Sequence, residues 1–161
     1  MEYRKLGRTG IEISAVGFGT MRLPTLDGVF SSIDIEKAKA VVRHAIDNGV
    51  NYVDTAYPYH LNGNSEKAVK EILADGYRQK VYVGDKLSMW VCDTYEECEE
   101  FFNGQLERTG AGYFDIYFLH SLDKNFWEKA KRLNVLKLFD KLIAEGKINH
   151  IGFSFQDKYE V

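Results

Sequence analysis

Five polar residues of different chemical types recur at a nearly constant interval in this chain. Thr20, Asp54, Lys86, His120 and Ser154 are 34, 32, 34 and 34 residues apart, and each ends a short apolar run. A carboxylate, an ammonium and an imidazole held together can transfer protons and stabilise developing charge. Considered singly, each residue also has a structural explanation, such as a turn cap for Asp54 or a packed side chain for His120. Their common spacing favours one shared active site.

The apolar runs before these residues predict β-strands, and the segments between the runs predict helices. Strands are expected over residues 15–20, 51–54, 81–83, 114–119 and from 150 onward, and helices over 34–48, 65–74, 94–108 and 126–144. Residues 3–14 form two short alternating runs around a Gly7-Arg8-Thr9-Gly10 turn, which predicts a β-hairpin. Strands that alternate with helices in this way indicate an α/β fold with a parallel sheet covered by helices.

The same alternation predicts where the chemistry lies. The carboxyl ends of parallel strands all face the same way, and the loops that follow them carry the active sites of α/β sheets and barrels. We therefore expect the five recurring polar residues to meet at one rim. A helical-repeat binding module with a similar period is disfavoured, because every unit here begins with an apolar β-run.

The composition is typical of a globular protein and excludes some partners. The 161 residues include 21 Lys+Arg and 24 Asp+Glu, so the formal charge is -3 and gives no basic footprint for nucleic acid or a membrane surface. No apolar run approaches the roughly 20 residues of a membrane span, and the first ten residues lack a secretory signal, so we expect a cytoplasmic protein. Cys92 and Cys98 do not have the spacing of a metal or redox motif, so we expect two reduced thiols and no metal site.

Several motifs, in order along the chain, closely resemble the aldo-keto reductase superfamily. They are Asn51–Tyr59 (NYVDTAYPY), Asn64–Glu66 (NSE), Val81–Lys86 (VYVGDK), Phe114–His120 (FDIYFLH) and Gly146–Ser154 (GKINHIGFS), with Lys5–Gly10 and Gly17–Arg22 also fitting. The resemblance implies a parallel (β/α) TIM-barrel type of fold, here a partial barrel with an N-terminal hairpin, about five strands and four helices. We expect residues 1–161 to form one domain, a truncated (β/α)8 barrel. Phe153–Phe155 and Leu119–Asp123 look most like bacterial and archaeal members with a C-terminal iron-sulfur tail, which this chain is expected to lack.

By this resemblance, the family's catalytic tetrad falls on Asp54, Tyr59, Lys86 and His120, and the reaction is reversible hydride transfer between NADPH or NADH and an aldehyde or ketone. Tyr59 would be the acid that protonates the carbonyl oxygen as charge develops on it. The Lys86 ammonium would favour ionisation of that phenol, and Asp54 would hold Lys86 charged and oriented. His120 would polarise and orient the carbonyl group.

The resemblance also implies cofactor contacts, at Gly19, Thr20 and Met21 beside the nicotinamide ribose and at Ser154 on the carboxamide. Two residues depart from the family pattern. Phe155 stands where relatives usually have Asn, which removes one carboxamide partner. Asp85 stands where relatives have a small or hydroxyl residue, and its carboxylate is expected to compete for Lys86.

Length sets a further expectation. A (β/α)8 barrel typically needs about 250 residues, so the expected five strands leave out the later strands and the loops that grip the nucleotide phosphates. We expect weak cofactor binding and impaired turnover from the isolated chain. Open strand edges also need covering, which predicts a homo-oligomer or a complementary half-barrel. The alternatives are a non-catalytic half-barrel that serves as a binding or scaffold subunit, and a fragment of a longer reductase.

Overall fold

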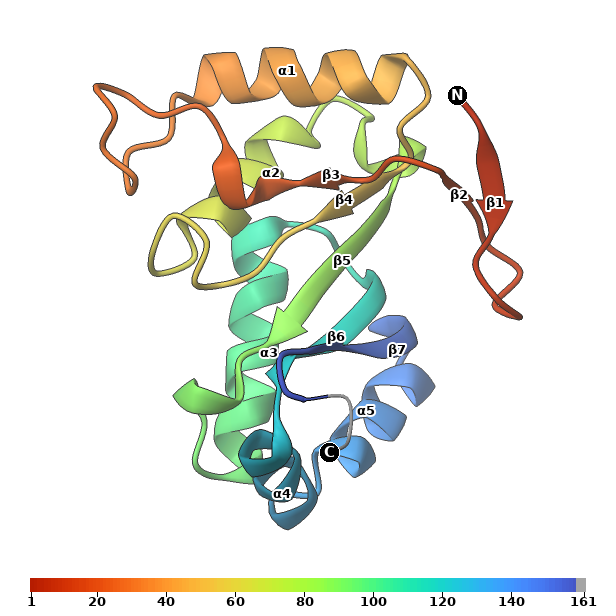
Figure 1. Cartoon of the computed structure of the whole chain (residues 1–161), viewed down its shortest axis with the longest axis vertical. Coiled ribbons are helices and arrows are strands. Elements are labelled where there is room, and N and C mark those ends of the chain that lie inside the picture. The colour runs from red at the N-terminus through yellow and green to blue at the C-terminus, as the bar shows by residue number, and fades with distance from the viewer. Residues whose placement is uncertain (159–161) are drawn as a thin grey trace.

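The computed structural model describes residues 1–158 and contains a hairpin followed by a series of alternating strands and helices (Figure 1). In chain order the strands and α-helices are β1 (Tyr3–Lys5), β2 (Glu12–Ser14), β3 (Phe18–Gly19), α1 (Ile35–Asp47), β4 (Tyr52–Asp54), α2 (Asn64–Ile72), β5 (Tyr82–Leu87), α3 (Tyr95–Thr109), β6 (Phe114–Leu122), α4 (Lys124–Arg132), α5 (Val135–Ala144) and β7 (Ile148–Phe155). Three short 3₁₀ helices, η1 (Thr20–Arg22), η2 (Arg78–Lys80) and η3 (Met89–Val91), occupy connections.

The five strands β3 to β7 form one sheet in sequence order, and every neighbouring pair is parallel. This topology confirms the parallel α/β fold expected from the sequence. The hairpin β1–β2 is a separate antiparallel pair. It is tied to the start of β4, because the Ser14 amide donates a 2.7 Å hydrogen bond to Asn51 Oδ1.

The helices lie along one face of the sheet, which we call the outer face (Figure 1). Helix α1 contacts α2, α2 contacts α3, and α3 contacts α5. The side chains between the sheet and these helices are fully buried, and include Val53, Val83, Leu87, Phe102, Tyr117, Leu138 and Leu142. Burial of this apolar layer fixes which strand residues face outward, because side chains alternate along a strand. The other face carries Asp54, Gly84, Lys86 and His120, and we call it the inner face.

Residues 126–144, expected as one helix, are two helices. Helix α4 ends at Arg132 and α5 begins at Val135, and Asn134 between them adopts a left-handed conformation with φ of 54°. The single-helix prediction was wrong because apolar residues continue at helical spacing across the break. The left-handed region favours Asn over other side chains, which is the signal that marks the break.

Aromatic rings lie against glycines of the neighbouring strands on the inner face. A Cβ atom built on Gly84 would overlap the Tyr52 hydroxyl and lie 3.2 Å from the ring of Phe118, and one built on Gly17 would lie 2.9 Å from Tyr52. On the far side of Phe118, a Cβ on Gly152 would be 2.8 Å from the ring. Glycine at these positions therefore makes the space that the two rings occupy.

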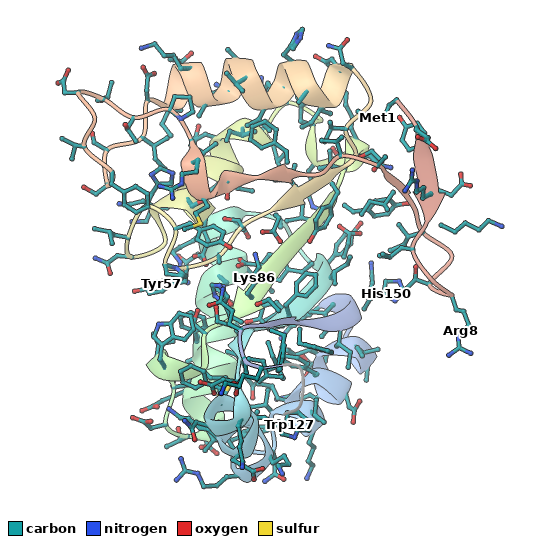
Figure 2. All side chains as sticks on the ribbon, in the orientation of Figure 1. Met1, Arg8, Tyr57, Lys86, Trp127 and His150 are labelled. Atoms are coloured by element: carbon teal, nitrogen blue, oxygen red, sulfur yellow. The ribbon has the colours of Figure 1, made fainter. Side chains whose placement is uncertain are left out.

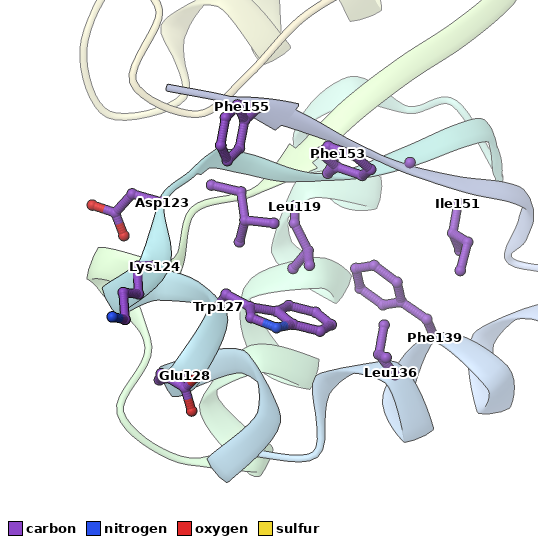
Figure 3. Close-up of a pocket in the computed structure, with 12 residues that line it drawn as sticks. Leu119, Asp123, Lys124, Trp127, Glu128, Leu136, Phe139, Ile151, Phe153 and Phe155 are labelled. Carbon is purple, nitrogen blue, oxygen red and sulfur yellow. The ribbon is translucent and has the colours of Figure 1, made fainter. Parts of the chain in front are cut away.

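The outer face of β7 is only partly covered by α5 in the part of the chain that the structure describes. Ile151, Phe153 and Phe155 all point to this side and are exposed, Phe153 by 64%. With Trp127 of α4 and Leu136 of α5 they line a cavity of about 880 Å³ (Figure 3). The cavity lies across the sheet from Asp54, Lys86 and His120, so it is separate from the candidate active site. Among residues 1–158, no helix has the length and apolar character that crossing a membrane requires.

Candidate active site

The centre of the candidate site is an ion pair between β4 and β5. Lys86 Nζ lies 2.5 Å from Asp54 Oδ2 and donates a second bond, of 2.8 Å, to the carbonyl oxygen of Thr55. The Lys86 side chain is 7% exposed and lies near the centre of the molecule (Figure 2), whereas the Asp54 side chain is 26% exposed. Asp54 pairs with Gly84, which is two residues before Lys86 on β5. This pairing brings Asp54 and Lys86 to the same rim of the sheet. The structure therefore brings together two of the predicted site residues.

Tyr59 lies over this ion pair, on the loop between β4 and α2. The centre of its ring is 5.0 Å from Lys86 Nζ, and its ring meets the imidazole of His120 edge to face, with centroids 5.9 Å apart. The loop returns over the sheet because the chain turns tightly after Tyr59, where four successive residues, 60–63, have positive φ. The four predicted residues Asp54, Tyr59, Lys86 and His120 thus gather at one rim of the sheet.

His120 forms the other side of the site and is neutral near pH 7. Burial, reinforced by the charge of Lys86, lowers the pKa of His120 from 6.5 to about 4. Its Nδ1 lies 3.3 Å from the Ser88 hydroxyl, and the indole of Trp90 packs on the ring at 5.1 Å. A neutral imidazole in this position can direct a hydrogen bond at a substrate oxygen without adding a second positive charge next to Lys86.

Two further residues belong to the site and were not found by sequence reasoning. The Tyr52 hydroxyl donates to Asp54 Oδ1 over 3.1 Å, so both oxygens of this carboxylate are engaged. Burial, followed by the charge of Asp54, raises the pKa of Tyr52, which keeps its hydroxyl a donor. The alternation of a strand gives a signal for Tyr52, because residues two apart share a face. Trp90 lies in η3, after β5, where no strand alternation in the sequence indicates which way its side chain points.

Asp85 does not compete for Lys86, contrary to the sequence-based expectation. The two side chains lie on opposite faces of β5. Asp85 is fully buried under α3, where its Oδ1 accepts from the Lys86 backbone amide and from Gln105 Nε2, at 2.8 and 3.0 Å. Burial and the neighbouring Glu66 raise the pKa of Asp85 well above its usual range.

The residues expected at the cofactor lie along the same rim with different accessibilities. Gly19 and Met21 are exposed, and no atom comes within 4 Å of a Cβ built on Gly19. Ser154 is half-buried, and its Oγ accepts a 2.7 Å bond from the Ser121 amide, which leaves its own proton free to donate. Thr20 is fully buried, and its hydroxyl bonds the Asp54 carbonyl oxygen and Ser65. No surface of Thr20 is open to a cofactor.

Five parallel strands with helices on one face and polar groups at the carboxyl rim define an α/β protein of the TIM-barrel type. The profile of the Aldo/keto reductase family matches residues 15–161, and the chain belongs to this family. Among solved structures, it is similar to an aldo-keto reductase from Bacillus halodurans in its holo form, with 26% identity and a TM-score of 0.80. The alignment covers 96% of this chain and 50% of that protein.

Two relatives found by sequence similarity have names other than aldo-keto reductase. The chain is 32% identical to L-galactose dehydrogenase of Arabidopsis thaliana over 96% of its own length and 48% of the relative's. It is 31% identical to a putative voltage-gated potassium channel subunit beta of Schizosaccharomyces pombe, over 99% of its own length and 46% of the relative's. The chain therefore spans about half the length of the curated relatives that it matches.

Proposed function

We propose that this chain carries the catalytic half of an NAD(P)H-dependent aldo-keto reductase, which reduces an aldehyde or ketone to an alcohol. The observation that carries this proposal is the meeting of a phenol, an ammonium and an imidazole at one rim, where the Tyr59 ring lies 5.0 Å from Lys86 Nζ and 5.9 Å from the His120 ring. Membership of the family and a relative named as a dehydrogenase agree with an oxidoreductase.

In this proposal, each residue of the tetrad has one role. Tyr59 protonates the substrate oxygen as negative charge develops there. Lys86 stabilises the phenolate that remains, because its ammonium lies within 5.0 Å of the Tyr59 ring. Asp54 holds that ammonium in place, and His120 donates a hydrogen bond that orients the carbonyl group. Alcohol oxidation would use the same groups in the opposite direction.

The cofactor would bind along the same rim. NADPH or NADH, when bound, supplies the hydride. The open space at Gly19, the exposed Met21 and the free hydroxyl proton of Ser154 fit the nicotinamide end of such a molecule. Thr20 would not contact the cofactor itself. Its hydroxyl would hold η1 against the end of β4 through its bond to the Asp54 carbonyl oxygen. The residues named here contact only the nicotinamide end of the molecule, so we expect the isolated chain to bind the cofactor weakly.

Reduction of an aromatic aldehyde, followed by the loss of NADPH absorbance, tests the proposal. The wild-type chain and the Tyr59→Phe variant are compared, each alone and with any protein that co-purifies. General acid catalysis contributes about 10²- to 10⁴-fold, so Tyr59→Phe is expected to lose at least 100-fold in kcat while keeping its fold. Tyr82→Phe is a matched control, because among residues 1–158 the Tyr82 hydroxyl has no hydrogen-bond partner. Equal rates for wild type and Tyr59→Phe would refute the proposal and favour a non-catalytic binding or scaffold subunit.

We further propose that another polypeptide, either a second copy of the chain or a complementary half-barrel, covers the open edge of the sheet at β7 and the apolar side chains beside it. The support is the row of exposed side chains at Ile151, Phe153 and Phe155. Exposed apolar groups in one contiguous patch are typical of an interface. Sedimentation of the wild type is expected to show self-association or a bound partner, and Phe153→Lys is expected to abolish it. A wild-type monomer at all concentrations and in all preparations would refute this.

A further inference from the structure

A short left-handed turn directly follows Tyr59. His60, Leu61, Asn62 and Gly63 have φ values of 55°, 64°, 50° and 74°. Glycine adopts this conformation freely and Asn tolerates it, but His and Leu are unfavourable there. Consecutive residues of this kind persist only where the surroundings impose them, and they concentrate at functional sites. The residues that hold this turn are therefore candidates for a functional role.

His60 is the residue that anchors the turn. Its side chain is 1% exposed and lies between the turn and the connection that runs from η1 to α1. Nδ1 lies 2.5 Å from the Phe30 carbonyl oxygen, and Nε2 accepts a 3.1 Å bond from the Leu23 amide. Because a carbonyl oxygen only accepts and an amide only donates, these partners place the ring proton on Nδ1. The Phe30 ring also stacks on the imidazole, with centroids 4.6 Å apart.

Further bonds join the same two segments. Asn64 Nδ2 donates to the carbonyl oxygens of His60 and Ser31, at 3.0 and 3.2 Å. The Gly63 amide bonds the Tyr57 carbonyl oxygen at 2.9 Å, which closes the loop on itself around Tyr59. The Tyr59 backbone is therefore held on its C-terminal side by a turn that is fastened to residues 23–31.

We propose that His60 is a positioning residue, which holds the Tyr59 phenol over Lys86 by locking the left-handed turn onto residues 23–31. This inference rests on the proposed function in assigning Tyr59 as the acid. Tyr59 makes no side-chain hydrogen bond to another described residue, so its position depends on its backbone and on its contacts with His120 and Lys86. Release of His60 would let the turn relax toward right-handed geometry and move the phenol away from the ammonium.

The test compares His60→Phe with His44→Phe. His60→Phe keeps a ring that can stack on Phe30 but removes both nitrogens. His44→Phe makes the same chemical change at an exposed position of α1. We expect His60→Phe to lower kcat at least tenfold with less than a threefold change in KM, because the acid is misplaced while the substrate pocket remains. His60→Gln, which restores an acceptor for the Leu23 amide, is expected to recover part of kcat. A purely structural role would lower the amount of folded protein and leave the kcat of the folded fraction unchanged.

Two spectroscopic measurements do not depend on activity. With ring-labelled tyrosine, the NMR signal of Tyr59, assigned by its loss in Tyr59→Phe, is expected to shift in His60→Phe and to stay in place in His44→Phe. Hydrogen exchange of the Leu23 amide is expected to accelerate in His60→Phe alone.

The outcomes separate this inference from the proposed function. An unshifted Tyr59 signal or an unchanged Leu23 exchange rate in His60→Phe would overturn the positioning role of His60, whatever the activity. If the Tyr59 signal shifts and Leu23 exchange accelerates in His60→Phe, but the wild type shows no Tyr59-dependent reduction, the turn is held as described and the reductase proposal is refuted instead. A wild-type kcat in folded His60→Phe would also overturn the inference.

Discussion

Asp85 and Lys86 are adjacent in sequence, and their side chains lie on opposite faces of β5. Lys86 reaches the inner rim and pairs with Asp54, while Asp85 is buried under α3, with Oδ2 lacking a partner among the described residues. The strand thus separates a charged group that faces the candidate site from a carboxyl group that is stable when protonated.

Asp85→Asn should stabilise the protein at alkaline pH. The pKa of Asp85 is raised in the folded state, so its contribution to stability is full below the unfolded value of 3.8 and is lost as pH rises through the folded value. Asn keeps the acceptor for the Lys86 amide and does not ionise. Urea unfolding is expected to give similar stabilities at pH 4, and an advantage for Asp85→Asn on the order of 1–3 kcal/mol at pH 9. A variant that is less stable than the wild type at pH 9 would contradict this.

Removing Asp54 and removing Lys86 from the ion pair should lower the free energy of unfolding by different amounts. Asp54→Asn leaves a nearly buried ammonium without a counter-charge, with only neutral oxygens to accept its hydrogen bonds. Lys86→Met leaves a carboxylate that is one quarter exposed and still bonded to Tyr52. We expect losses of about 2–3 kcal/mol for Asp54→Asn and about 1 kcal/mol for Lys86→Met. Urea unfolding at pH 7 measures both, and the reverse order would show that the ammonium is better solvated than the structure indicates.

His120 should make the protein less stable in acid. Its pKa is lowered from 6.5 to about 4 in the folded state, so its contribution is full above pH 6.5 and is lost as pH falls through 4. Between pH 6.5 and pH 4, the free energy of unfolding is expected to fall by roughly 3 kcal/mol more in the wild type than in His120→Gln, because each pKa unit corresponds to 1.36 kcal/mol. Unfolding curves at intervals from pH 7 to pH 4 provide the measurement. The exposed His44→Gln is the control, and parallel pH profiles for wild type and His120→Gln would rule the effect out.

The break between α4 and α5 should depend on Asn134. At φ of 54°, Asn134→Gly is expected to change the free energy of unfolding little, whereas Asn134→Val is expected to cost about 1–2 kcal/mol. Asn149→Val serves as the control, because Asn149 is an exposed strand residue where a β-branched side chain is favourable. Equal stabilities of the Gly and Val variants at position 134 would mean that this residue does not set the break.

The sequence predicted the order of elements and the shared rim well, for a simple reason. Short apolar runs that alternate with longer segments of helical periodicity favour strands between helices, and parallel strands bring their carboxyl ends to one edge. Asp54, Lys86 and His120 therefore came together as the spacing indicated. The break at Asn134 could not be predicted by periodicity, because the apolar pattern continues through it.

The buried polar groups were harder to predict. Asp85, Glu66 and Gln105 are fully buried on the outer face, where a polar residue in a sequence normally indicates solvent. Gln105 Nε2 bonds both carboxyl groups, and only the folded chain brings these three residues together. The role of His60 was hidden in the same way, because both of its partners are backbone atoms at least 30 residues away in sequence.

The packing of Tyr52 and Phe118 against glycines has a consequence for how this chain can vary. Any side chain at position 84 would collide with the Tyr52 hydroxyl, and any at position 152 would collide with Phe118. Substitution at either glycine is acceptable only together with a smaller residue on the adjacent strand. Among homologues, the pairs 52/84 and 118/152 should therefore change together, and a chain with alanine at 84 should not keep tyrosine at 52.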